Sequence, residues 1–181
     1  MTSASNNIID LYERHAREWV GDRNREKVFI EKSWLERFCA LLKSGGTVLD
    51  LGCGVGKPIA SYLLSQGVDI CGVDSSPTMV SLAQANFPEQ KWVVADMRML
   101  SLGRAFDGVI AWDSFFHLNF DDQRRMFPVF RAHAKSGAPL LFTSGPQHGE
   151  ALGSFRGEPL YHASLAPEEY RTFWRRMASS A

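Results

Sequence analysis

Short apolar runs along this chain alternate with longer segments in which apolar residues recur every three or four positions. The short runs predict buried strands, at 48–51, 68–73, 91–95, 106–111 and 140–143. The longer segments predict helices, at about 7–20, 25–42 and 58–67, from 77 onward, from about 120 toward 135, and at 167–177. Strands that alternate with helices in this way predict an α/β fold made of parallel β-α-β units with right-handed crossovers.

The last part of the chain departs from this alternation. Residues 160–165 read as a short extended segment, and Pro167 followed by two glutamates is typical of a helix start. No run after 140–143 has the pattern of a further core strand. The strand at 140–143 would then lie at an open edge with unpaired N–H and C=O groups. We expect such an edge to favour a homodimer or to lower stability.

A glycine-rich turn follows the first strand. Gly52, Gly54 and Gly56 separate the apolar run at 48–51 from a helical pattern that opens at Pro58. A strand that ends in glycines and leads into a helix lets backbone N–H groups approach a ligand closely. A dinucleotide fingerprint would have its third glycine at position 57, which is Lys57. This departure argues against a nicotinamide-dependent oxidoreductase.

Asp50 and the three glycines after it resemble motif I of the class I S-adenosylmethionine-dependent methyltransferases. The likeness continues through 72–79, 94–97 and 106–113, and it extends from about Ile8 to Tyr170. The resemblance implies a Rossmann-like three-layer α/β/α sandwich with strand order 3-2-1-4-5. The two strands that usually complete this sheet are not evident. It also implies S-adenosylmethionine as cofactor, S-adenosylhomocysteine as product and a small-molecule methyl acceptor.

The same resemblance divides the single domain into three parts. Residues 1–45 would form a helical cap, 46–145 the cofactor-binding core and 146–181 a segment on the substrate side. Within this division, the residues expected to contact the cofactor are Asp50, Gly52, Cys53, Gly54, Gly56, Asp74, Ser75, Met79, Asp96, Met97 and Trp112.

Asp74 is the strongest of these candidates on spacing alone. It lies 18 residues past Gly56, close to the interval typical of an acid that binds ribose hydroxyls. The alternative is a helix-capping aspartate, although Ser75 and Ser76 are also available as caps. In the family, the position of Asp96 accepts a hydrogen bond from the adenine amine; the alternative here is a turn aspartate. An alanine at any of the three glycines would put a methyl group into the ligand space.

The substrate end should follow the fourth strand. Trp112 and Phe115 offer aromatic faces to a sulfonium, and Asp113 and His117 are the candidate catalytic groups. A lone histidine is more often structural than catalytic. The expected substrate pocket contains Tyr12, Trp19, Arg23, Phe115, His148 and His162. Tyr12 and Trp19 could instead be the buried stripe of an amphipathic helix.

Composition narrows the class of partner. Twenty Lys and Arg residues balance twenty Asp and Glu residues, which gives no electrostatic reason to expect a nucleic-acid or membrane partner. No run is long enough for a membrane-spanning helix, and the N-terminus lacks the apolar core of a signal peptide. The three cysteines have no metal-ligand spacing, which favours reduced thiols in the cytoplasm and no metal site. An inactive or truncated protein that still binds the cofactor stays an alternative.

Overall fold

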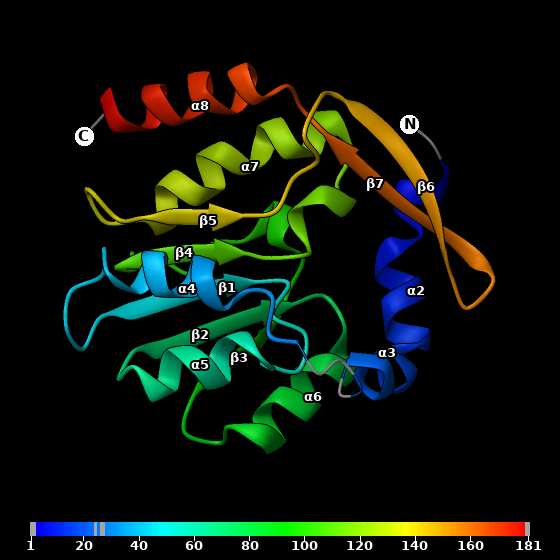
Figure 1. Ribbon diagram of the computed structural model, residues 1–181, viewed down its shortest axis with the longest axis horizontal. Helices are drawn as coiled ribbons and strands as arrows, with labels where there is room; N and C mark the ends of the chain where they lie inside the picture. Colours follow the sequence, from blue (N-terminus) through cyan, green and yellow to red (C-terminus); the bar gives the residue numbers. More distant parts are fainter. Residues whose placement is uncertain (1–2, 24, 26–27, 180–181) are drawn as a thin grey trace.

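The computed structural model describes residues 3–23, 25 and 28–179 (Figure 1). Its centre is a sheet of five strands in the order β3-β2-β1-β4-β5, and every neighbouring pair is parallel. The strands are β1 (Thr47–Leu51), β2 (Asp69–Asp74), β3 (Lys91–Val94), β4 (Gly108–Ala111) and β5 (Leu140–Phe142). The predicted strand order is therefore confirmed.

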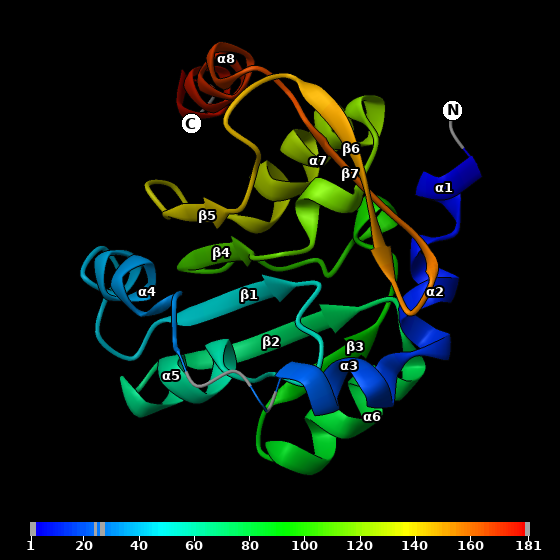
Figure 2. The same ribbon diagram turned by 45° about the vertical axis from the view of Figure 1, so that its right-hand side comes forward.

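Helices cover both faces of this sheet, as Figure 2 shows. One face carries α4 (Lys32–Cys39), α5 (Ile59–Ser65) and α6 (Pro77–Asn86), and the other carries α7 (Phe120–His133) and α8 (Pro167–Ser179). Successive side chains of a strand point to opposite faces, so Val48 packs with the first group of helices while Leu49 and Leu51 pack with the second. The result is the predicted three-layer α/β/α sandwich.

The N-terminal segment differs from its prediction. The single helix expected at 7–20 is two helices, α2 (Ile8–Arg14) and α3 (Ala16–Arg23), separated at His15 and preceded by α1 (Ser3–Asn6). The helix expected at 25–42 begins at Lys32; residues 26 and 27 of that range lie outside the described residues. Of its apolar residues, Leu35 and Phe38 are buried, whereas Trp34 and Leu41, which follows the helix, are exposed.

A β-hairpin forms a second, separate sheet near the end of the chain. Its strands are β6 (Gly149–Phe155) and β7 (Glu158–Ser164), which pair antiparallel. The extended segment expected at 160–165 overlaps β7, but β6 was not predicted. The hairpin lies beside α1 and α2 (Figures 1 and 2), and β7 also contacts a short 3₁₀ turn, η2 (Phe115–His117). Within the described residues no sixth strand joins the main sheet, so β5 is an edge strand.

Candidate functional site

The carboxyl ends of the first four strands open onto one cavity of about 410 Å³. Parallel strands place their carboxyl ends at the same edge of a sheet, so motifs far apart in the sequence meet there. The predicted residues that line the cavity are Tyr12, Trp19, Arg23, Asp50, Gly52, Cys53, Gly54, Asp74, Ser75, Met79, Asp96, Met97, Trp112, Asp113, His117 and His162. The helices α1 to α3 and strand β7 wall the cavity on the side away from the sheet.

The glycine turn lies directly against the end of β2. The Gly54 N–H donates a hydrogen bond of 2.9 Å to Asp74 Oδ2. Gly52 and Gly54 have φ values of +73° and +52°, a backbone region that favours glycine. A Cβ added at Gly52 would lie 2.2 Å from the Ser114 Cβ. Only a glycine therefore allows this close approach of the β1 and β4 ends, and an alanine methyl at Gly52 would meet Ser114 first rather than the ligand space that was predicted.

Gly56 plays a different part from the one predicted. It does not line the cavity, and a Cβ added there would lie 2.9 Å from Trp92 and 3.0 Å from Phe87, both side chains of the protein itself. Its φ is +76°. The glycine is required by the turn and by packing against these aromatic rings, so the expectation that an alanine at Gly56 would enter the ligand space is wrong.

Asp74 accepts hydrogen bonds both from the glycine turn and from the start of helix α6, which follows Asp74 in the chain. Its Oδ2 accepts from Gly54, and its Oδ1 accepts from the Ser76 N–H at 2.9 Å. Ser76, in turn, is the residue whose side chain caps α6 by accepting from the Met79 N–H. Burial raises the pKa of Asp74 even though these backbone hydrogen bonds oppose the rise. Each carboxyl oxygen keeps a lone pair for a further donor from the cavity.

Asp50 is the most unusual polar group of the site. It is 1% exposed, and its Oδ2 has no hydrogen-bond partner in the described structure. Burial, followed by the charge of Asp74, raises the pKa of Asp50 to about 7. A buried carboxyl oxygen without a partner carries a desolvation cost that a hydrogen-bond donor in the cavity would relieve.

Asp96 is held by an arginine that the sequence did not single out. Arg98 donates from Nε and Nη2 to the Asp96 carboxylate at 3.0 and 2.5 Å, and its Nη1 reaches Asp122 Oδ2 at 3.1 Å. Burial opposes ionisation of Asp96, but the hydrogen bonds from Arg98 hold its pKa below the ordinary value. Asp96 is thus an ionised residue of the cavity lining, and Arg98, in the 3₁₀ turn η1 (Met97–Met99), fixes the orientation of its carboxylate.

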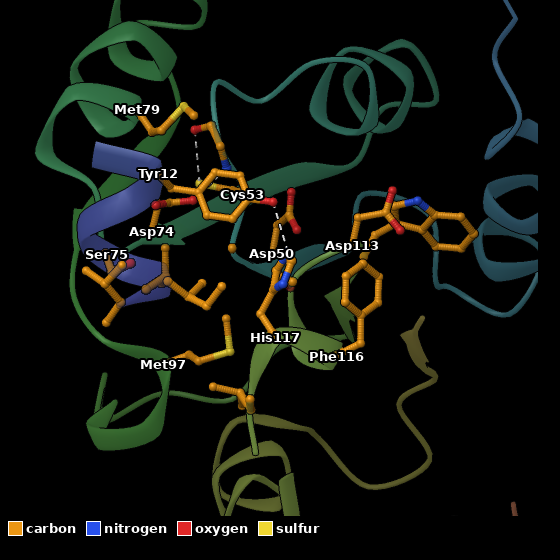
Figure 3. A pocket seen from close by; sticks show the side chains of 18 of the residues that line it. Tyr12, Asp50, Cys53, Asp74, Ser75, Met79, Met97, Asp113, Phe116 and His117 are labelled. Carbon is orange, nitrogen blue, oxygen red and sulfur yellow. Dashed lines mark hydrogen bonds between the residues drawn. The ribbon is translucent and has the colours of Figure 1, made fainter. Parts of the chain in front are cut away.

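Tyr12 and His117 form a hydrogen-bonded pair on the other side of the cavity. Figure 3 shows the two rings pointing toward one another, and the Tyr12 hydroxyl lies 2.9 Å from His117 Nε2. His117 Nδ1 lies 2.8 Å from the Tyr161 carbonyl oxygen, which can only accept. Nδ1 therefore carries the proton and Nε2 accepts from Tyr12. Burial lowers the pKa of His117 to about 4, so the ring is neutral at pH 7.

Two predicted substrate residues do not reach the cavity. Phe115 is fully buried against Phe127 and Phe130 in the core, because the η2 turn directs it inward; its neighbour Phe116 lines the cavity instead. His148 stacks on Phe120 with ring centroids 4.4 Å apart, outside the cavity lining. The other predicted histidine, His162, lies on β7 in the lining.

Comparison with known proteins agrees with this arrangement. Residues 48–137, which run from the second residue of β1 past β4 and include the glycine turn, match the family model described as a methyltransferase domain. The chain belongs to this methyltransferase domain family.

Curated relatives of this methyltransferase domain are similar over part of their length. The magnesium-protoporphyrin O-methyltransferase of Rhodobacter capsulatus is 30% identical over 109 residues, which cover 58% of this chain and 47% of the relative. The trans-aconitate 2-methyltransferase of Escherichia coli is 38% identical over 84 residues, which cover 45% of this chain and 32% of the relative. The matched region spans about half or less of the length of these relatives.

Solved structures share the fold of this methyltransferase domain. A 1,6-didemethyltoxoflavin-N1-methyltransferase from Burkholderia thailandensis has a TM-score of 0.74 at 17% identity, covering 98% of this chain and 80% of that one. The amino pentose methyltransferase CalS10 from Micromonospora echinaspora has a TM-score of 0.68 at 19% identity, covering 88% of this chain and 87% of that one. At these identities the likeness shows the fold alone.

One contact that holds helix α2 in place was not predicted from the sequence. Glu13 on α2 accepts hydrogen bonds from Thr78 N–H at 3.1 Å and Thr78 Oγ1 at 2.7 Å, and from the Ser76 hydroxyl. These bonds, the Ser76 bond foremost, lower the pKa of Glu13. A carboxylate near a helix N-terminus is stabilising, so α2 is tied to the start of α6.

Two findings limit the kinds of site within the described part of the chain. No helix there combines the length and apolar character needed to cross a bilayer. Among the same residues, no group of three or more His, Cys, Asp or Glu side chains could hold a metal ion.

Proposed function

We propose that the chain is an S-adenosylmethionine-dependent methyltransferase that acts on a small molecule. The observation that carries the proposal is the meeting of Asp50, the glycine turn and Asp74 around one cavity, with the buried Asp50 Oδ2 left unpartnered. Two solved structures with the same fold, both of the glycopeptide N-methyltransferase MtfA, are described as complexes with S-adenosylhomocysteine and S-adenosylmethionine.

The cavity residues fit the three parts of this cofactor. Asp50 Oδ2 is suited to the methionyl ammonium, which donates hydrogen bonds and carries the opposite charge. Asp74 keeps lone pairs on both carboxyl oxygens for the ribose hydroxyls. Met79 and Met97 are soft apolar groups that also line the cavity and suit an adenine face. Asp96 and the Met97 N–H are the proposed partners of the adenine edge.

Methyl transfer from a sulfonium requires little of the protein beyond orienting the two reactants. Bound S-adenosylmethionine supplies a methyl group on a positively charged sulfur, with a good leaving group. Trp112 and Phe116 line the cavity and can present aromatic faces to positive charge. Tyr12, fixed by His117, and Asp113, at the end of β4, offer hydrogen-bond acceptors to the incoming substrate. Holding the two reactants in line is the main contribution of such a site.

Isothermal titration calorimetry with S-adenosylmethionine and S-adenosylhomocysteine tests the proposal directly. Both should bind, and Asp74→Ala should weaken both about tenfold or more, because charge-assisted hydrogen bonds to the ribose are lost. Asp69→Ala is the matched control, since Asp69 lies exposed at the opposite end of the same strand. Absence of binding by the wild-type chain would refute the function, and an unchanged affinity in Asp74→Ala would remove Asp74 from its role.

Two further properties belong to this proposal. The outer edge of β5 favours pairing with a second copy of the chain, because an edge strand presents unpaired N–H and C=O groups. Cys39, Cys53 and Cys71 are all free thiols, which supports a reducing compartment such as the cytoplasm.

A further inference from the structure

Four aromatic side chains lie together on one side of the cavity. Tyr12 comes from α2, Phe116 and His117 come from η2, and His162 comes from β7, and all four line the cavity. The centroid of the His117 ring lies 5.3 Å from that of Tyr12, 4.7 Å from that of Phe116 and 4.9 Å from that of His162. The Phe116 and His162 centroids are also 4.9 Å apart. We call these four residues the ring wall; Figure 3 labels three of them, Tyr12, Phe116 and His117.

The ring wall is uncharged at neutral pH. Burial lowers the pKa of His117 to about 4, and burial also lowers the pKa of His162. Burial raises the pKa of Tyr12, so its hydroxyl group keeps its proton. A charged group held against this wall would lose hydration without meeting a partner of opposite sign in the wall. The described lining residues beside the four rings, on α2, at the end of η2 and on β7, are apolar: Ile8, Ile9, Leu118 and Leu160.

The hydrogen-bonding groups at this end of the cavity suit an uncharged molecule. The Tyr12 hydroxyl donates to His117 Nε2, because the Tyr161 carbonyl holds the ring proton on Nδ1, so the Tyr12 oxygen is left to accept. Trp112, which follows β4 in the lining, has a buried Nε1 donor without a partner in the described structure. Asp113 also lines the cavity, but it is exposed, so water screens its charge. A neutral acceptor and a neutral donor are therefore both available here.

The strand order places the ring wall beyond the proposed cofactor partners. Asp96 follows β3, Asp74 ends β2, Asp50 lies in β1, and η2, which carries two of the four rings, follows β4. Because the sheet has the order β3-β2-β1-β4, the proposed adenine, ribose and methionyl partners succeed one another across it, and the ring wall comes next. A molecule lying against the ring wall would thus adjoin the methionyl end of the cofactor rather than its adenine.

We propose that the methyl acceptor is an uncharged molecule with a planar aromatic ring, which lies against the ring wall. This inference rests on the proposed function. Aromatic rings attract one another in offset-stacked and edge-to-face arrangements, with centroids about 4.5–7 Å apart. Phe116 and His162 are the members of the wall that should touch the acceptor, because both are partly exposed, whereas His117 is buried behind them.

NMR titration of the chain saturated with S-adenosylhomocysteine tests the inference without knowledge of the natural acceptor. The probe 2-naphthol is neutral and aromatic, and decahydro-2-naphthol is its saturated counterpart. The probes 2-naphthoate and 2-naphthylmethylammonium carry a negative and a positive charge on the same ring system. We expect 2-naphthol to bind about fivefold more tightly than each of the other three. Equal binding of the saturated probe, or tighter binding of either ion, would overturn the assignment.

A substitution at Phe116 tests the ring wall itself. Phe116→Leu keeps an apolar side chain but removes the ring, so it should weaken 2-naphthol about fivefold and leave S-adenosylhomocysteine within twofold. Phe120→Leu is the matched control, because Phe120 forms a similar ring pair with His148 outside the cavity lining. The control should change neither affinity. Equal losses of 2-naphthol affinity in the two variants would overturn the assignment.

A pair of substitutions at His162 gives a second test that does not depend on the Phe116 variant. His162→Phe keeps a ring and His162→Leu removes it, while both lose the hydrogen bond with the Leu160 backbone. The first variant should retain the affinity for 2-naphthol, and the second should lose about fivefold. Equal affinities in the two would overturn the assignment.

The same titrations distinguish failure of this inference from failure of the proposed function. Binding of S-adenosylhomocysteine by the wild-type chain with none of the four probes bound would overturn the aromatic acceptor while the function stands. Failure of the wild-type chain to bind S-adenosylhomocysteine would refute the function itself.

Discussion

At the scale of single residues, Asp50 is a group of the candidate site whose burial lowers the stability of the folded protein. Its backbone pairs with Gly72 of β2 and Ile110 of β4 near the end of β1, its side chain is buried, and one carboxyl oxygen has no partner. The sequence located Asp50 through the motif that follows it. Its burial depends on strands β2 and β4 from other parts of the chain, so the raised pKa could not be predicted from the local sequence.

The pH dependence of unfolding should reveal this cost. Because the pKa of Asp50 rises from an ordinary 3.8 to about 7 on folding, the folded state retains its proton between these values and the unfolded state does not. Stability contributed by this group therefore falls as pH rises from about 4 to 7. Asp50→Asn removes the titration, so its stability relative to wild type should improve by roughly 2–3 kcal/mol between pH 5 and pH 8.

Urea unfolding of both proteins at the two pH values measures this difference. Asp69→Asn is the control, because it removes a carboxylate at the exposed start of β2. The same Asp50→Asn protein should bind S-adenosylhomocysteine more weakly than wild type. A constant difference in unfolding free energy from pH 5 to pH 8 would contradict the assignment of a raised pKa.

Neighbouring residues also show the limit of reading side chains from a sequence. Phe115 and Phe116 are the same residue type, and the sequence-based prediction placed Phe115 rather than Phe116 in the substrate pocket. The 3₁₀ turn Phe115–His117 decides, because it buries Phe115 in the aromatic core and leaves Phe116 in the lining. Glu13 was missed because its partners, Ser76 and Thr78, are distant in the chain.

At the scale of elements, the turn between β1 and α5 combines two kinds of glycine. Gly54 lies against the cavity, and Gly56 lies against Phe87 and Trp92. The sequence predicted the turn and its place between strand and helix, because the strand–glycine–helix pattern is local. It did not separate these two roles, since the aromatic rings that surround Gly56 come from the end of α6 and from β3.

Two alanine substitutions should distinguish backbone strain at a positive φ from steric overlap of the new methyl group with its neighbours. Gly56→Ala places a methyl group 2.9 Å from Trp92 at a φ of +76°, whereas Gly67→Ala has a φ of +71° and no heavy atom within 4 Å. The backbone strain is thus matched, at about 1–3 kcal/mol in each variant. Gly56→Ala should be less stable than Gly67→Ala by a further 1–3 kcal/mol or so, through overpacking. Equal unfolding free energies of the two variants in urea would show that Trp92 moves aside without a measurable cost in stability.

The β6–β7 hairpin is the element that the sequence did not predict in full. Most of β6 is exposed, so its residues from Gly149 to Phe155 carry no alternation of apolar and polar positions for a pattern to detect. β7 was partly predicted because Tyr161 and Ala163 are buried against α2. An element held mainly by contacts with distant helices leaves a weak signal in its own sequence.

At the scale of the whole molecule, the five strands could be predicted because each is short and apolar, whereas their order in the sheet came from the family resemblance. The edge at β5 was predicted from the lack of a later strand pattern. Beside this edge the structure has a largely apolar groove of about 330 Å³, which includes Leu140 of β5 and Trp174 and Met177 of α8. No sequence pattern indicated this groove, since it depends on how α8 packs on the sheet.

A second copy of the chain is the proposed occupant of this face. Light scattering over a range of protein concentrations should show a dimer that dissociates on dilution. Trp174→Lys places a charge beside the β5 edge and should shift the equilibrium toward monomer. Trp34→Lys is the matched control, because Trp34 is similarly exposed, at 50% against 43%, but lies on α4 across the sheet. A monodisperse monomer at every concentration would contradict the proposal.

The walls of the cavity come from opposite ends of the chain. Helix α2 and hairpin β6–β7 are joined by Arg14, which donates two hydrogen bonds of 2.6 and 2.8 Å to Glu158, and His15 lies 2.7 Å from the same carboxylate. These contacts are surface ion pairs, which are individually weak. Beneath them, Ile8 and Leu11 of α2 pack with Tyr161 and Ala163 of β7 in a buried apolar cluster. The first helices and the hairpin are therefore one structural unit, so a substitution in either of these distant segments will be felt by the other and by the cavity that both line.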